Sequence, residues 1–137
     1  MADDQRRELL SPYARSLGMR IEALEGEPLP VVAIEFTHDL EGRPGALHGG
    51  AISGILETAG YAALRKTLQN DGRTARLKPI NVTVQFLRAG LRKPTFALGR
   101  ISRLGRRNAN ITVEAWQDER ERPIATAVMN VMVVDPD

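Results

Sequence analysis

The sequence predicts an α+β fold in which one long helix packs against one face of an antiparallel sheet of five or six strands. Residues 50–69 contain no proline and are rich in small and aliphatic side chains, which is typical of a buried helix. After Asn70-Asp-Gly72 the apolar residues recur at every second position in four segments, which is typical of strands. The turns between those segments are of hairpin length, which favours an antiparallel arrangement.

The N-terminal residues 1–18 are expected to form a helical extension. Asp3 or Asp4 can cap a short helix that runs to Leu10. Ser11-Pro12 then places a capping serine before a proline at the first helical position, and Gly18 ends this second helix.

Six segments are expected to be strands because their apolar residues alternate. They are residues 19–25, 30–37, 78–88, 95–103, 109–117 and 123–134. In the third, Ile80, Val82, Val84 and Phe86 are expected to face one way. The last strand is apolar on both faces, which suits a central position. The loops 88–94, 104–107 and 118–123 are each expected to join two neighbouring strands.

The predicted helix 50–69 carries small residues on every side, so we expect it to be buried all round. Glycine costs about 1 kcal/mol relative to alanine inside a helix. Gly54 and Gly60 therefore indicate that a sheet or a second helix lies very close to the helix backbone.

The composition indicates a single cytoplasmic domain, residues 1–137, and excludes several classes of function. Nineteen basic side chains nearly balance 17 acidic ones, which argues against a nucleic-acid partner. The charged N-terminus is followed by no signal-like apolar run, and no stretch is long enough to span a membrane. There is no cysteine, and His38 and His48 have no metal-ligand spacing, so we expect no metal site. No motif for a nucleotide cofactor occurs either, and no organic cofactor is expected.

The segment from Arg43 to Arg65 contains the most informative residues. Gly49 and Gly50 precede a helix, whose first N–H groups can polarise a carbonyl oxygen. Glu57 is the one acidic residue of this segment, and a buried carboxylate is expected to be paired or used. It lies about 10–12 Å along the helix from the glycines, too far to reach the same substrate. We therefore expect a homodimer in which Gly49 of one chain faces Glu57 of the other.

Three segments carry a resemblance to a known family. They are Gly45-Ala-Leu-His-Gly-Gly-Ala-Ile-Ser-Gly-Ile-Leu-Glu57, Val82-Thr-Val-Gln-Phe-Leu-Arg88 and Arg103-Leu-Gly-Arg-Arg107. Together they resemble the hotdog-fold acyl-CoA thioesterases of the phenylacetate-degradation and 4-hydroxybenzoyl-CoA type, over roughly residues 30–134. The resemblance implies a long central helix wrapped by an antiparallel sheet, and hydrolysis of acyl-CoA to a free acid and CoA.

The resemblance also implies roles for individual residues. Gly49 matches the glycine whose N–H polarises the thioester carbonyl, and Glu57 matches the acidic residue that acts as nucleophile or as general base. His48 matches a histidine that is structural or orients the substrate. The implied substrate-binding residues are Gly50, Asn81, Arg88, Arg103, Arg106 and Arg107, the last three through the phosphates of CoA.

Three positions depart from the family pattern. Many relatives carry Asn or Gln at the position of Gly42. The 4-hydroxybenzoyl branch has a Thr helper at the position of Tyr61, and some relatives have Ser or Thr near Pro79. Water activation would then depend on Glu57 with fewer helpers. The alternatives are an acyl-thioester dehydratase or hydratase, and an acyl-CoA binding module without activity. The acyl group and the choice between a dimer and a dimer of dimers stay open.

Overall fold

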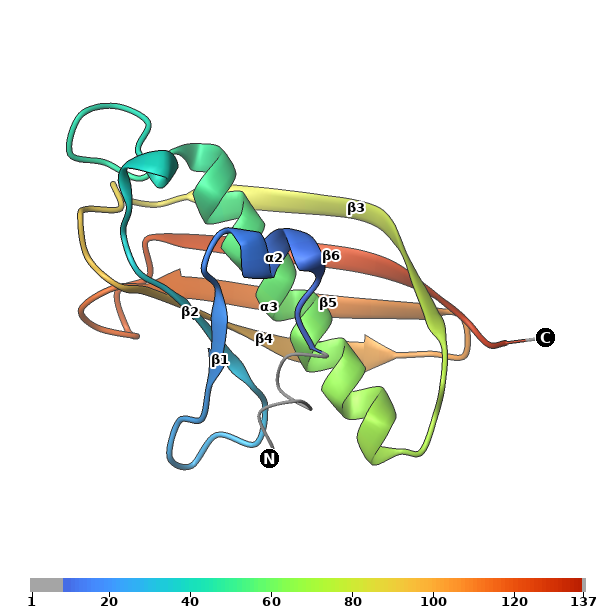
Figure 1. The fold of residues 1–137 in the computed structure, drawn as a ribbon. Helices are drawn as coiled ribbons and strands as arrows, with labels where there is room; N and C mark the ends of the chain where they lie inside the picture. Colours follow the sequence, from blue (N-terminus) through green and yellow to red (C-terminus); the bar gives the residue numbers. More distant parts are fainter. Residues whose placement is uncertain (1–8, 137) are drawn as a thin grey trace.

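The computed structural model of this protein describes residues 9–136. Six strands form one antiparallel sheet that curves around a long helix (Figure 1). The helical elements are α2 (Pro12–Ser16), the 3-10 turn η1 (His38–Leu40) and α3 (Gly49–Asn70). The strands are β1 (Arg20–Glu22), β2 (Val31–Ile34), β3 (Arg76–Phe86), β4 (Thr95–Leu104), β5 (Asn108–Trp116) and β6 (Ala125–Val134). The predicted fold class, central helix and strands are confirmed.

The second predicted helix begins as its capping pattern indicates. The Ser11 Oγ accepts a hydrogen bond from the Ala14 N–H at 3.1 Å, and Pro12 occupies the first helical position. Gly18 follows the helix with a φ of +84°, a conformation that favours glycine. The helix predicted from Asp3 or Asp4 falls mainly on residues 1–8, which lie outside the described residues.

The order of strands in the sheet is β1-β2-β4-β5-β6-β3. The loops 104–107 and 118–123 join neighbouring strands, as predicted. The prediction for loop 88–94 is wrong, because β3 pairs with β6 and not with β4. The Leu87 and Arg88 N–H groups both donate to the Ile124 carbonyl, at 2.8 and 3.1 Å, which ties the end of β3 to the residue before β6. The chain then crosses the end of the sheet to reach β4, so a loop of hairpin length serves as a crossover.

The core lies between α3 and the sheet. Apolar side chains of α3 such as Ile55, Leu56 and Ala63 are fully buried. The helix backbone approaches the sheet most closely at Gly60 and Gly99. A Cβ on Gly99 would lie 3.0 Å from both the Ala59 carbonyl oxygen and the Gly60 Cα, and a Cβ on Gly60 would overlap the Met129 Sδ. The sheet is therefore the close neighbour that Gly60 indicates.

Gly54 has a different environment. A Cβ there would lie 3.8 Å from the Met19 Cε and 4.0 Å from the Tyr13 hydroxyl, which is ordinary contact. This part of α3 faces α2 and solvent rather than the sheet. Gly54 therefore has no packing requirement in the described chain.

The two glycines are expected to respond oppositely to alanine. Gly99→Ala should lower the free energy of unfolding by about 1–3 kcal/mol, because the new methyl group meets backbone atoms that cannot move aside. Within a single chain Gly54→Ala should leave it unchanged or raise it by up to about 1 kcal/mol, because a Cβ meets only ordinary contacts there and alanine favours the helix. Urea denaturation at equal protein concentration measures both. Equal destabilisation by the two changes would contradict this account.

The helix α3 is not buried all round, which corrects the sequence-based expectation. The side facing the sheet is buried, but Ser53, Gly54, Thr58 and Tyr61 are only partly covered and Glu57 is exposed. Because several residues on this second side are small, few side chains project from the helix there. Glu57 is thus a solvent-facing carboxylate within one chain.

Strand β3 forms one edge of the sheet and is largely exposed. The register with β6 shifts between Pro79 and Asn81, so Ile80 occupies a bulge. Val82, Val84 and Phe86 pair with residues of β6 that face the helix, and the bulge at Ile80 interrupts this alternation. The prediction that all four residues share one face therefore holds only for the three that follow the bulge. None of the helices in residues 9–136 is long and apolar enough to cross a membrane.

Candidate active site

The N-terminus of α3 leaves one backbone donor without a partner. The His48 Nδ1 accepts from the Gly50 N–H at 2.8 Å, so this histidine caps the helix. The Ala51 and Ile52 N–H groups donate to the His48 carbonyl at 2.9 and 3.1 Å. No acceptor within residues 9–136 takes the Gly49 N–H. Gly49 therefore supplies the donor that is free to bind a carbonyl oxygen.

Gly42 and Gly50 are required by the position of His48. A Cβ on Gly50 would lie 2.9 Å from the His48 Nδ1, and a Cβ on Gly42 would lie 2.9 Å from the His48 Cα. An Asn or Gln at position 42 would therefore collide with this histidine. Gly50, predicted to bind substrate, instead gives its N–H to the cap and makes room for the imidazole ring.

Gly49 has no such requirement. A Cβ there would lie 3.5 Å from the Phe86 ring, which is ordinary contact, and its φ is not in the left-handed region. Packing within one chain therefore does not explain why the residue is glycine. The absence of a side chain keeps the Gly49 N–H open to a ligand.

The Gly49 pocket, the cavity of about 410 Å³ in front of this N–H, is mainly apolar. Leu47, Ile52 and Phe86 supply its apolar walls, and Arg88 lies at its border. The crossover after β3 forms one side, because the Leu47 N–H donates to the Gly90 carbonyl at 2.8 Å. The sequence did not indicate that Phe86 lines this pocket. Its place in an alternating strand predicts which face of the sheet it is on, but not which residues lie opposite that face.

Glu41 holds the loop that leads into α3. Its carboxylate accepts from the Gly45 N–H at 2.8 Å and from the Arg92 Nη2 at 2.8 Å. The Gly45 N–H and then Arg92 lower the pKa of Glu41, with smaller help from His38. The loop is thereby joined to the crossover that forms the other side of the Gly49 pocket.

Glu41→Gln is expected to lower the Tm most at neutral pH. Because the folded-state pKa is below the ordinary value, the carboxylate stabilises the fold above that value. This contribution is lost as the pH falls through the lowered pKa, so the Tm difference from wild type should shrink in acid. Thermal melts across pH measure it, with the surface residue Glu35→Gln as control. A Tm difference that grew in acid would contradict this sign.

Glu57 lines a different cavity, the Glu57 pocket, of about 210 Å³. Tyr13 of α2 and Tyr61 of α3 share this pocket, and no hydrogen bond or ion pair of Glu57 occurs within residues 9–136. Burial and then the charge of Glu57 raise the pKa of Tyr61. The Arg65 guanidinium lies 5.4 Å from the centre of the Tyr61 ring, and burial lowers its pKa. Gly49 and Glu57 are therefore not brought together within one chain.

The other predicted binding residues are dispersed. Arg88 borders the Gly49 pocket. Asn81 accepts from the Asn130 Nδ2 at 2.7 Å on the sheet face away from the helix. The basic turn 103–107 lies near the other end of α3, where the Arg73 Nη2 donates to the Arg106 carbonyl at 2.6 Å. A helix of this length separates it by roughly 30 Å from Gly49 of the same chain.

Residues 9–136 contain no group of three or more His, Asp or Glu side chains placed to hold a metal ion. The chemistry at hand is that of backbone N–H groups, one histidine, carboxylates and arginines. The N–H groups can bind and polarise a carbonyl oxygen, and the arginines can bind an anionic part of the same substrate.

Comparisons with known proteins identify the family and the fold. The family described as acyl-CoA thioesterase N-terminal domain matches residues 40–132. No curated protein sequence matches the chain. A thioesterase structure from Haemophilus influenzae superposes with a TM-score of 0.84 at 18% identity, covering 98% of this chain and 92% of that one.

Two further structures are similar. A phenylacetic acid degradation-related protein from Ralstonia eutropha JMP134 has a TM-score of 0.77 and 26% identity, covering 93% of this chain and 97% of that one. A conserved protein from Pseudomonas aeruginosa has a TM-score of 0.81 and 19% identity, covering 94% and 98%. With its family match over residues 40–132 and its fold, the chain belongs to the hotdog-fold acyl-CoA thioesterase family.

Proposed function

We propose that the protein hydrolyses acyl-CoA thioesters to free acids and CoA, in active sites that two copies of the chain build together. The observation that carries the proposal is the unpartnered Gly49 N–H, which opens into a mainly apolar pocket at a helix N-terminus. Family membership supports thioester hydrolysis in general.

The thioester carbonyl would accept a hydrogen bond from the Gly49 N–H. The positive end of the α3 dipole adds to this donor, and both strengthen as negative charge develops on the oxygen. Donors of this kind contribute about 10²–10³ in rate in other enzymes. The apolar walls from Leu47, Ile52 and Phe86 would exclude water from the carbonyl oxygen.

Glu57 of the partner would supply the base or nucleophile. It is the one acidic residue of α3, it is exposed in one chain, and about 12 Å separates it from Gly49 along the helix. As a base, its carboxylate takes a proton from water while the water oxygen bonds to the carbonyl carbon. The tetrahedral intermediate then expels the CoA sulfur, which recovers the proton from Glu57. As a nucleophile, the carboxylate would attack the carbonyl carbon and expel the CoA thiolate, which leaves an anhydride that water hydrolyses to the free acid and Glu57.

The exposed edge of β3 supports pairing of two copies. Ile80, Val82 and Phe86 on this strand are 46, 37 and 56% exposed, and β6 is its only neighbour among the described strands. Long apolar edges are covered in native proteins. The opposite edge is protected, since β1 has three residues and Arg20 forms an ion pair with Glu35 at 3.3 Å. A two-fold pairing of β3 strands would cover the edge and bring the two α3 helices close.

The hydrogen bonding of His48 supports hydrolysis over hydration or dehydration. A neutral imidazole that accepts at Nδ1 carries its proton on Nε2. His48 in its capping state therefore has no free basic nitrogen with which to remove a proton from an acyl chain. This argues against the dehydratase or hydratase alternative, which would use the histidine as base.

Release of free thiol from a panel of acyl-CoAs tests the proposal. The chain contains no cysteine, so the protein adds no thiol to the assay. Turnover of at least one acyl-CoA, with a dimer in solution, is the expected result. If no thiol is released but CoA esters raise the Tm, the protein is a binding module, and the proposal of hydrolysis is wrong.

A further inference from the structure

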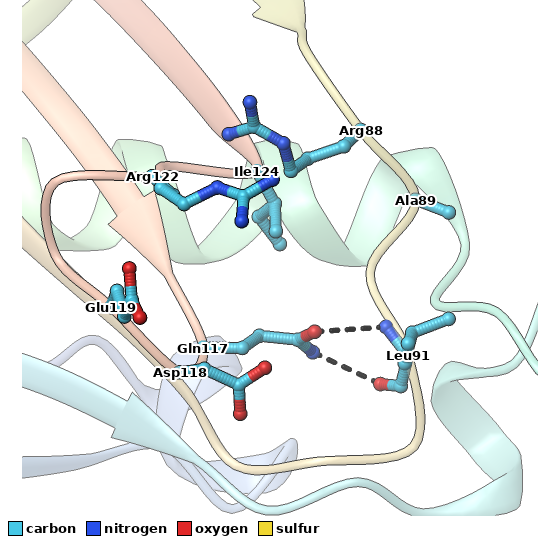
Figure 2. A pocket seen from close by; sticks show the side chains of 8 residues that line it. All are labelled: Arg88, Ala89, Leu91, Gln117, Asp118, Glu119, Arg122 and Ile124. Carbon is cyan, nitrogen blue, oxygen red and sulfur yellow. Dashed lines mark hydrogen bonds between the residues drawn. The ribbon is translucent and has the colours of Figure 1, made fainter.

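A second cavity adjoins the Gly49 pocket and carries two arginines. This crossover pocket, of about 230 Å³, lies between the crossover after β3 and the β5–β6 turn (Figure 2). Arg88 comes from the crossover and Arg122 from the turn. Arg88 and Ala89 line both the crossover pocket and the Gly49 pocket. A ligand bound at Gly49 can therefore extend along Arg88 into the crossover pocket.

The two arginines bring uncompensated positive charge together. Figure 2 shows both guanidinium groups at the end of the pocket where Ile124 lies. The Arg88 Nη1 donates to the Pro123 carbonyl at 2.6 Å, which holds its side chain toward the turn that carries Arg122. No carboxylate forms an ion pair with either arginine within residues 9–136. Two like charges in one cavity favour a bound anion.

The acidic residues of the pocket lie toward its other end. Figure 2 places Asp118 and Glu119 below the arginines, on the β5–β6 turn. Asp118 is neutralised by the Lys93 Nζ at 2.8 Å. Glu119 is the remaining negative charge, and it should weaken binding of an anion rather than prevent it.

The pocket is held in shape before any ligand binds. The Gln117 side chain accepts from the Leu91 N–H and donates to the Leu91 carbonyl, both at 3.0 Å, as the dashed lines in Figure 2 show. The same amide donates to the buried Thr95 Oγ1 at 3.0 Å. These bonds fix the crossover to the end of β5, so little ordering is needed when an anion binds.

We propose that Arg88 and Arg122 bind the phosphate groups of the CoA part of the substrate. The inference rests on the proposed function, because it takes the thioester to lie at Gly49. Guanidinium groups bind phosphate oxygens through paired N–H donors, and the shared wall at Arg88 joins the two parts of the ligand site. Arg122 is then a substrate-binding residue that the sequence motifs do not include.

Arg122→Gln tests the site, because the Arg122 side chain is exposed and can be changed without loss of packing. We expect the Kd for CoA, measured by calorimetry, to rise about tenfold. The KM for an acyl-CoA should rise similarly with kcat unchanged, and the KM for the matching acyl-N-acetylcysteamine, which has no phosphate, should not change. Arg20→Gln removes the same charge at the far edge β1 and should leave all values as in wild type.

Glu119→Gln gives a second test with the opposite sign. Removing this carboxylate should tighten CoA binding, and the gain should diminish at high salt. Equal CoA affinity in wild type and Arg122→Gln, or weaker binding when a residue of the turn 103–107 is changed instead, would overturn the assignment. CoA affinity is measured without turnover, so the two proposals can fail separately. If the wild-type protein releases no thiol but Arg122→Gln still weakens CoA binding, the phosphate site stands and the proposal of hydrolysis is wrong.

Discussion

Glu57→Gln is expected to lower kcat for acyl-CoA hydrolysis by about three orders of magnitude, because a positioned general base contributes about 10²–10⁴. Glutamine keeps the size of the side chain but cannot accept a proton or attack a carbonyl. KM should change little, since Glu57 would contact water or the reacting carbon rather than CoA. Thiol release under saturating substrate measures the loss.

The fold should survive this substitution. Glu57 is exposed and makes no hydrogen bond or ion pair within residues 9–136, so the free energy of unfolding should change by less than about 0.5 kcal/mol. Glu25→Gln, at an exposed carboxylate in the β1–β2 loop, is a matched control that should retain full activity. Normal turnover by Glu57→Gln would remove this residue from the mechanism.

Mixing two inactive variants is expected to restore activity, and this is the second large effect. Gly49→Val should be inactive, because its side chain fills the space in front of the N–H, while its backbone conformation accepts valine. A mixed dimer of Gly49→Val and Glu57→Gln chains would contain one site with Gly49 and Glu57 both intact. With half of the dimers mixed and one of their two sites intact, about a quarter of wild-type activity should return.

Chains carrying two different affinity tags allow the mixed dimers to be isolated and assayed alone, where about half of wild-type activity is expected. Two tagged forms of Glu57→Gln, exchanged in the same way, serve as control and should stay inactive. If mixed dimers form but show no activity, the base does not come from the partner, and the composite site is wrong.

Much of the fold could be predicted from local sequence patterns. The capping residues Ser11 and His48, the length of α3 and most strand bounds depend on neighbours along the chain, which a single sequence displays. The loop 88–94 shows where this reasoning ends. Its length suits a hairpin, but the partner of β3 is chosen by packing over the whole sheet.

Part of the geometry around Gly49 and Glu57 could be predicted for similar reasons. The Gly49 N–H and the distance to Glu57 along the helix follow from helix geometry, so a gap between them was expected before the structure was known. The role of Gly50 was not foreseen, because only the position of the His48 ring shows that the glycine makes room for the cap. Arg122, which we propose as a phosphate ligand, was not indicated by the sequence, since a lone arginine in a turn has no distinguishing pattern.

The sequence alone thus determined the elements, the helix that carries Gly49 and Glu57, and the likeness to hotdog thioesterases, because these depend on short-range periodicity and one contiguous motif. Only the tertiary structure decided that Glu57 faces solvent, that β3 lies at an exposed edge, and that Arg88 and Arg122 line one pocket. These features join residues far apart in the chain. They arise from strand pairing and side-chain packing across the whole domain, which no local pattern records.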